Sequence, residues 1–172
     1  TFARQAVIAI ENVRLLNETK AAPERQTAPA QVLQVISSSV ADAAPVFEKI
    51  IQRCETLFRC EYVNVVLLDD DGLMHLIQDT AGDSDDAIDR HKSLLRSQFP
   101  RPPRDSIRGY AIHKRKVLHY ADMDSPGVPA GLREFSKRSG VDGSAVFVPM
   151  FWEGKGIGTL AAHRFPPRPF SD

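Results

Sequence analysis

Two pairs of short segments with alternating polarity, one in the middle of the sequence and one near its end, most constrain the fold. The first pair, YVNVVLLD and LMHLIQDT, is joined by the turn signal DDDG at residues 69–72. The second pair, SAVFVPMFW and KGIGTLAAHRF, is joined by a turn at residues 153–156. β-Branched segments separated by such turns predict β-hairpins, so we expect an antiparallel sheet.

A helical pattern precedes the first hairpin. Asp42 has the character of an N-cap, and Pro45 is tolerated in the first turn that follows it. We expect this helix to end at about Phe58 and to bury one apolar face, formed by Phe47, Ile50, Ile51, Cys54, Leu57 and Phe58.

Shorter elements are predicted between the two hairpins. The patterns indicate helices at residues 84–97, 106–115 and 130–138, the last closed by Gly140, and a short strand at residues 116–120. Helices before and between two hairpins predict an α+β fold, in which helices cover the faces of an antiparallel sheet.

The opening segment spaces apolar residues alternately four and three apart, in the heptad pattern of a helix that packs on a partner helix: Phe2, Ala6, Ala9, Val13 and Leu16. Pairing with a second copy of the chain and packing on the chain's own domain both fit this pattern. Residues 21–30 contain two prolines and predict a linker. Because the chain starts at Thr1 within a helical pattern and stops at Asp172, we expect a piece of a longer protein.

The charge balance excludes several classes of partner. The chain has 22 Lys+Arg and 22 Asp+Glu, so it lacks the basic excess of nucleic-acid-binding modules. Its longest apolar stretches are far shorter than a membrane span, so no membrane contact is expected. Two cysteines provide no disulfide framework, and a reducing, cytoplasmic location is expected.

The usual catalytic and metal-binding signatures are missing. The glycine run at residues 154–158 precedes a strand rather than a helix, which argues against a phosphate loop. The acidic turn at residues 69–71 lacks the glutamate of a calcium loop, and the five histidines have no ligand spacing. We predict no catalytic residue and no metal, and expect Cys54 and Cys60 to be buried, inert thiols.

Candidate binding residues come from two patterns. A basic series that includes Arg108 follows an acidic patch, and it forms either a solvated face or a mouth that attracts an anionic ligand. Asn64 shares a strand face with Tyr62, and Ser144 opens a later strand, so each either faces an internal pocket or is satisfied by backbone. The six candidate ligand-binding residues are Tyr62, Asn64, Arg108, Tyr110, His113 and Ser144.

Three stretches together resemble GAF domains of bacterial signalling proteins. TFARQAVIAIENVRLLNE is similar to the helix that closes one GAF domain and leads to the next, and SAVFVPMFWEGKGIGTLAAHRFPPRPFSD is similar to the last GAF hairpin. DSIRGYAIHKRKVLHYAD resembles the family's helix-then-strand segment, with Gly109 and Ala111 at the expected places.

The resemblance implies a central antiparallel sheet of five or six strands, with terminal helices on one face and short helices and loops over a ligand pocket on the other. The domain would span residues 31–172 without its own C-terminal helix, after a signalling helix at residues 1–20 and the linker. The implied function is a non-catalytic sensor module. It would pair as a homodimer through helices and relay a signal to an output domain in the same chain, as in two-component sensor histidine kinases or nucleotide cyclases.

Departures from the family's ligand signatures leave the ligand open. The NKxnFxxxDE signature of cyclic-nucleotide binders is absent, and no cysteine accompanies His113 as in bilin binders, because Cys54 and Cys60 lie too early. The methionine sulfoxide reductases of this fold need cysteines in other segments. Neither bilin nor haem is expected. A structural dimerisation domain without a small ligand and a small thiol-redox enzyme are the alternatives.

Overall fold

The computed structural model describes residues 40–81 and 85–170 of the chain. The chain divides into two compact units, Thr1–Ala43 and Ala44–Asp172, and the second unit holds the sheet and the site described below. The predicted linker and the predicted helix at residues 1–20 lie outside the described residues, together with the heptad residues Phe2, Ala6, Ala9, Val13 and Leu16.

A five-stranded antiparallel sheet forms the centre of the second unit. Its strands are β1 (Tyr62–Leu68), β2 (Met74–Asp79), β3 (Leu118–Tyr120), β4 (Ser144–Trp152) and β5 (Lys155–Arg164), in the order β2-β1-β5-β4-β3. Both predicted hairpins are present, β1–β2 and β4–β5. The pairing of β1 with β5 joins the two hairpins into one sheet, and the predicted α+β fold is confirmed.

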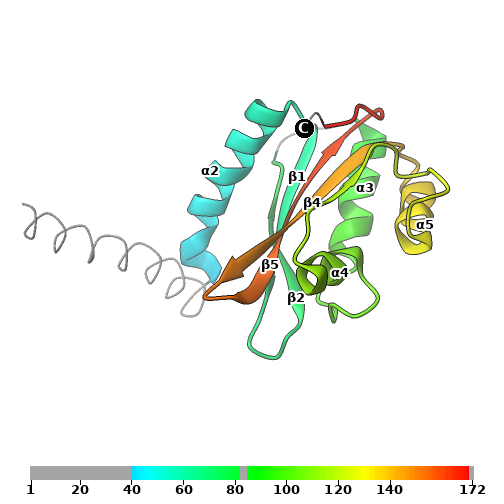
Figure 1. Ribbon diagram of the computed structural model, residues 1–172. Coiled ribbons are helices and arrows are strands. Elements are labelled where there is room, and N and C mark those ends of the chain that lie inside the picture. The colour runs from blue at the N-terminus through cyan, green and yellow to red at the C-terminus, as the bar shows by residue number, and fades with distance from the viewer. Residues whose placement is uncertain (1–39, 82–84, 171–172) are drawn as a thin grey trace, which may run out of the picture. The chain divides into compact units, whose positions relative to one another are not determined.

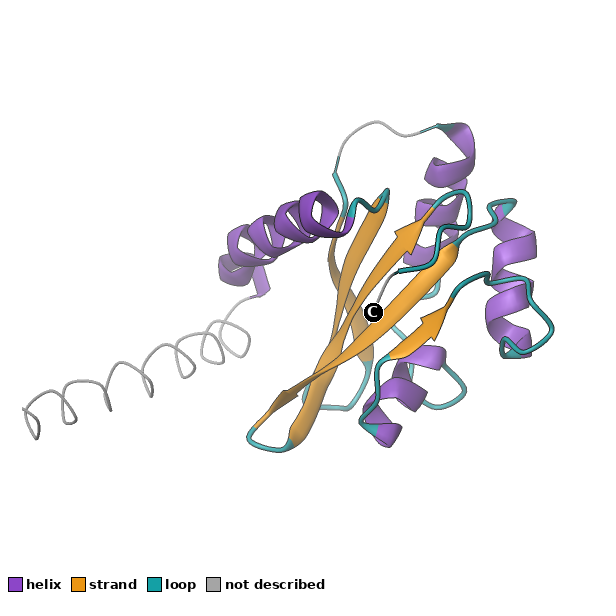
Figure 2. Cartoon of the chain, turned by 45° about the horizontal axis from the view of Figure 1, so that its top comes forward, coloured by secondary structure: helices purple, strands orange, loops and turns teal. Residues whose placement is uncertain are grey.

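Helices cover the two faces of the sheet unequally (Figures 1 and 2). Helix α2 (Val40–Phe58) lies on one face. Helices α3 (Asp86–Arg96), α4 (Ile107–Lys114) and α5 (Ala130–Ser139) lie on the other. None of the helices in the described ranges has the length and hydropathy of a membrane span.

Helix α2 differs in two ways from the expectation. It begins at Val40, so Asp42 lies inside the helix and is not its N-cap. Phe47 and Ile51 are buried, but Ile50, Leu57 and Phe58 are 39%, 75% and 42% exposed. A single helix on a sheet buries only a narrow stripe of residues about four apart, and the predicted apolar face was too wide.

The register of the sheet decides which side chains meet under α3, α4 and α5. On β1 and β5, Tyr62 pairs with His163, Asn64 with Ala161 and Val66 with Thr159. Because alternate residues of a strand share a face, these side chains all lie on one face of the sheet. Phe147 of β4, which pairs with Ala161, lies on the same face.

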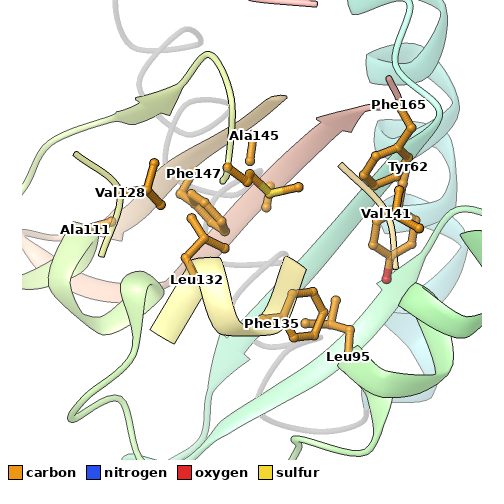
Figure 3. Close-up of a cluster of buried hydrophobic side chains, with 12 residues drawn as sticks. Tyr62, Leu95, Ala111, Val128, Leu132, Phe135, Val141, Ala145, Phe147 and Phe165 are labelled. Atoms are coloured by element: carbon orange, nitrogen blue, oxygen red, sulfur yellow. The ribbon is translucent and has the colours of Figure 1, made fainter. Parts of the chain in front are cut away.

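The main core fills the space between this face and the helices above it (Figure 3). Phe147 and Leu132 belong to the cluster beside α5, and Tyr62 and Phe165 belong to it at the end of β1 and β5. The opposite face of β1 buries Val63, Val65 and Leu67. Strand β1 is therefore covered on both faces, which explains why it is apolar apart from Asn64.

Local signals set the ends of the helices that surround the site. Asp85 caps α3 by accepting hydrogen bonds from Ala87 N and Ile88 N, and Ser106 caps α4 by accepting one from Gly109 N. Gly140 closes α5 in the left-handed conformation, as predicted. By setting where the helices begin and end, these residues determine which side chains of α4 and α5 face the sheet.

Candidate functional site

A cavity of about 970 Å³ lies between the sheet and helices α3, α4 and α5. Apolar side chains from all three helices and from β4 line it, among them Leu95, Ile107, Leu132, Phe135 and Phe147. Small-molecule sites in proteins are concave, mostly apolar and of this size, with a few polar groups that fix orientation. The cavity therefore has the build of a ligand site.

Arg108 is a buried polar residue in the lining of the cavity. Its side chain is only 4% exposed, and α4 places it over the sheet. Nη2 donates a hydrogen bond of 2.6 Å to Asn64 Oδ1, and Nη1 donates one of 3.1 Å to Thr159 Oγ1. The guanidinium also lies 5.4 Å from the centre of the Phe147 ring.

The positive charge of Arg108 has no negative partner among the described residues. Its hydrogen-bond acceptors, Asn64 and Thr159, are neutral, and none of the ion pairs in the described ranges includes it. Burial lowers the pKa of Arg108 to about 10, which still leaves it charged at neutral pH. Buried charges in proteins are normally paired, so Arg108 departs from this rule among the described residues.

Two buried histidines lie beside this cation. His163 lines the cavity, and its ring centre is 5.3 Å from that of His91. Burial lowers the pKa of His91 to about 4 and that of His163 well below its ordinary value, with Arg108 adding to both effects. Both rings are therefore neutral at pH 7, and each offers one N–H donor and one acceptor.

Several buried polar atoms around Arg108 have no partner within the described part of the chain. They are Asn64 Nδ2, His91 Nε2 and both ring nitrogens of His163. Because Asn64 Oδ1 accepts from Arg108, its amide nitrogen is a donor without an acceptor. The inner side of the site thus has more donors than acceptors, which favours an acceptor-rich ligand.

Tyr62 lies between the two buried histidines and the ion pair of Asp79 with Arg96. Its ring packs against His91 and His163, and its hydroxyl donates to Asp79 Oδ2 over 3.1 Å. Asp79 in turn accepts two hydrogen bonds from Arg96 on α3. Burial and the neighbouring Asp79 raise the pKa of Tyr62, so its hydroxyl stays protonated and keeps donating.

The outer part of the cavity also carries excess positive charge. Arg101, Arg104 and Arg138 line it, against two acidic residues, Asp105 and Glu134. Surfaces of one sign at the mouth of an apolar cavity raise the local concentration of ligands of the opposite sign. The charge at the mouth and the cation inside the cavity thus favour the same class of ligand.

The six candidate ligand-binding residues occupy different places. Arg108, Tyr110 and His113 line the cavity, the last two with exposed side chains. Asn64 contacts Arg108, and Tyr62 belongs to the aromatic cluster around the histidines. Ser144 lies apart from the cavity lining: its hydroxyl donates to Ala121 O and accepts from Arg168 N.

Sequence reasoning missed His91, Thr159, Phe147 and His163. His91 lies on a helix whose pattern indicated only an apolar inner side, and the other three lie on β4 and β5. Alternation along β5 would have placed Thr159 and His163 on one face. Their approach to Arg108 depends on the pairing of β1 with β5, which sequence periodicity does not give.

The cysteines lie away from this site. Cys54 and Cys60 are outside the cavity lining, and Cys60 Sγ lies 3.7 Å from the backbone oxygen of Cys54. Cys60 is buried as predicted, whereas Cys54 is only partly buried, because it lies at the margin of the α2 face that meets the sheet. Burial raises the pKa of Cys60 to about 12, which suppresses the reactive thiolate. Across the described ranges, no three His, Cys, Asp or Glu side chains gather as metal ligands would.

Comparison with known proteins identifies relatives of this fold. The GAF domain family matches residues 42–172. A GAF domain/HD domain protein from Geobacter sulfurreducens is 19% identical with a TM-score of 0.59, covering 77% of this chain and 82% of that one. A domain of a putative two-component sensor histidine kinase from Sinorhizobium meliloti 1021 is 19% identical with a TM-score of 0.54, covering 74% and 76%.

A third similar structure belongs to an enzyme. It is the type II free methionine-R-sulfoxide reductase from Thermoplasma acidophilum, 16% identical with a TM-score of 0.54, covering 77% of this chain and 80% of that one. No curated protein sequence matches this chain. At these identities the structural likenesses show the fold alone.

Proposed function

This chain belongs to the GAF domain family, and on that premise we propose that it is a non-catalytic sensory module that binds a small molecule in the cavity under α3, α4 and α5. The observation that carries the proposal is the unneutralised guanidinium of Arg108 inside an apolar cavity of about 970 Å³. A purely structural domain gains nothing from a buried, unpaired charge, because such a charge costs stability.

The relay from the site runs through the sheet. Arg108 contacts Asn64 of β1 and Thr159 of β5, and the opposite face of β1 buries its odd-numbered residues on the α2 side. A ligand that draws the Arg108 side chain away from Asn64 and Thr159 changes the position of β1 and β5, and therefore how α2 packs on the other face of β1. The resulting shift in helix packing can be no larger than the difference in ligand affinity between the two states.

The proposed module works as a homodimer within a longer signalling protein. Val46, Ile50 and Leu57 form an exposed apolar stripe on α2, which suits pairing between helices. An HD-domain protein and a sensor histidine kinase are among the proteins of similar structure, so an output domain of a kinase or another signalling type in the same chain is part of the proposal.

A dimerisation domain without a ligand is the competing function. It predicts that the cavity is only a packing defect and that filling it is harmless or stabilising. The exposed stripe on α2 suits this function equally well. The charged lining of the cavity distinguishes the two, because a packing defect has no need of it.

The test is a metabolite screen by thermal unfolding on the 172-residue chain, followed by hydrogen exchange with any stabilising compound. We expect a compound that stabilises the chain, loses its effect in the cavity-filling variant Leu132→Trp, and changes amide protection in α2 as well as around the cavity. Protection changes confined to the cavity would contradict the relay. A screen without any stabilising compound, together with a Leu132→Trp variant of raised stability, would favour the dimerisation domain.

A further inference from the structure

The size of the cavity and the position of its charge narrow the class of ligand. A single inorganic anion beside Arg108 would leave most of a cavity of about 970 Å³ unfilled and lined by apolar side chains. Apolar lining gains free energy when apolar ligand surface replaces water there. The ligand therefore needs a sizeable apolar body as well as a negative group.

The inner polar groups define the negative end. The Arg108 guanidinium has about five N–H donors, and Nη1 and Nη2 each use one of them on Thr159 and Asn64, so donors remain for the oxygens of a carboxylate. Asn64 Nδ2 and the one N–H of the neutral His163 ring are further donors without a partner within the described part of the chain. His91 Nε2 is an acceptor, because Nδ1 carries the ring proton and donates to Ser139 Oγ, whose own hydrogen goes to Ser136 O. A metal ion is disfavoured there, because the cationic Arg108 would repel it.

The apolar lining defines the other end. Phe135 and Phe147 contribute aromatic rings, and Leu95 and Leu132 contribute branched side chains from two helices. Aromatic and branched side chains of this kind contact a ring or a short hydrocarbon chain closely. The positive mouth, with Arg104 and Arg138, favours entry of an anion over entry of a cation.

We infer that the cavity binds an organic monocarboxylate, with the carboxylate on Arg108 and an aromatic or aliphatic body among the apolar side chains of α3, α5 and β4. This inference rests on the proposed sensory function and specifies its ligand. Binding is reversible and leaves the ligand chemically unchanged.

The experiment measures thermal shift and calorimetric affinity on the 172-residue chain with a panel of aromatic and aliphatic monocarboxylates. Each acid is paired with its uncharged primary amide, and sodium nitrate and inorganic phosphate serve as anions without an apolar body. We expect at least one acid to bind about tenfold or more tightly than its own amide, as the loss of a charge-assisted hydrogen bond implies. Both inorganic anions are expected to bind more weakly than that acid.

Two variants assign the binding to Arg108. Arg108→Gln removes the cation, and Arg53→Gln is the matched control on α2, where the arginine is exposed on the opposite side of the sheet. We expect the first to reduce carboxylate affinity about tenfold or more and the second to leave it unchanged. If Arg108→Gln does not fold, Asn64→Asp retains the guanidinium and neutralises it with a carboxylate of the chain itself, with the same expected loss.

Each other outcome overturns the inference in a defined way. Equal affinity for acid and amide would mean that only the apolar body is recognised, and tighter binding of nitrate or phosphate would mean an inorganic anion site. Carboxylate affinity that survives both Arg108→Gln and Asn64→Asp would place the anion elsewhere. If no carboxylate binds but another compound does and is lost in Leu132→Trp, the inference fails while the sensory function stands. If nothing binds at all, both fail.

Discussion

Arg108 Nη2 donates to Asn64 Oδ1 over 2.6 Å, so a cation from α4 is held by a neutral amide on β1, the neighbour of the central strand β5. Both side chains are buried. The amide orients the guanidinium without cancelling its charge, as the proposed carboxylate site requires. Replacing Asn64 tests how much this hydrogen bond contributes to holding the guanidinium in place.

Asn64→Leu should destabilise the chain by roughly 2–4 kcal/mol, because it leaves a buried guanidinium donor without an acceptor. Asn64→Asp should retain most of the free energy of unfolding, since it keeps an acceptor and adds a negative charge. Urea unfolding of both variants measures the difference. Equal stability of Asn64→Leu and wild type would mean that this hydrogen bond contributes nothing.

The buried histidines predict a loss of stability in acid. The pKa of His91 is about 4 in the folded chain, against an ordinary value of 6.5, so between these values the unfolded chain binds the extra proton. Stability should be full above pH 6.5 and fall as the pH drops toward 4, with His91 contributing roughly 3 kcal/mol at the full shift.

The variant His91→Phe separates titration from packing. It should reduce the fall in stability between pH 6.5 and 4, measured by urea unfolding across that range, and leave the part due to His163. Phe135→Leu, which alters the ring 4.9 Å from His91 without removing a titratable group, should lower stability at every pH and keep the slope. An unchanged slope in His91→Phe would assign the acid sensitivity to other groups.

Gly109 permits the loop at the mouth to lie against α4. A Cβ there would lie 2.0 Å from the backbone oxygen of Pro103, so Gly109→Ala must displace the loop and should cost about 1–3 kcal/mol and weaken ligand binding. Gly131→Ala is the matched control: it meets nothing within 4 Å and lies on α5, where it should add about 0.5–1 kcal/mol. Thermal unfolding of both variants gives the comparison, and equal effects would rule out the close approach.

The thiols are expected to be inert. With a pKa of about 12, Cys60 has only about one thiolate in ten thousand molecules at pH 8, so iodoacetamide should modify it far more slowly than a free thiol. The double variant Cys54→Ser, Cys60→Ser should bind ligand like wild type. Thiol-dependent reduction of free methionine sulfoxide that disappears in this variant would instead support the redox enzyme.

The stripe on α2 predicts how the chain self-associates. The double variant Ile50→Glu, Leu57→Glu should lower the mass measured by light scattering from dimer to monomer if helix pairing uses this face. It should leave the monomer's thermal midpoint nearly unchanged, because both side chains are substantially exposed. A dimer that persists in this variant would place the contact on other residues.

Short-range patterns predicted much of this fold. The alternation in residues 62–80 and 144–164 gave both hairpins, and the turn and cap residues placed α3, α4 and α5 within a few residues of their observed bounds. The errors lie on α2, where the number of buried positions depends on how a helix meets the sheet. The periodicity of the sequence shows which positions of α2 are apolar, but not how many of them contact the sheet.

The site was less predictable because its parts come from distant segments. Arg108 and Asn64 stood out as a charge near a predicted helix start and an amide in an apolar strand. Thr159 and His163 gave no such signal, and the register between β1 and β5 decides that they share a face of the sheet with Asn64 and Tyr62. A side chain whose role depends on long-range pairing cannot be recognised from its neighbours in sequence.

The strand order also constrains how the chain acquires this site during synthesis. The edge of β1 that pairs with β5 stays unpaired until β5 has been synthesised, about a hundred residues later. At a synthesis rate of about 5–20 residues per second, this takes on the order of 5–20 s. Until then the apolar β1–β2 hairpin has an open edge and Arg108 lacks its contact with Thr159. The nascent domain is thus most exposed to aggregation, and to chaperones, in the interval before its last hairpin emerges from the ribosome.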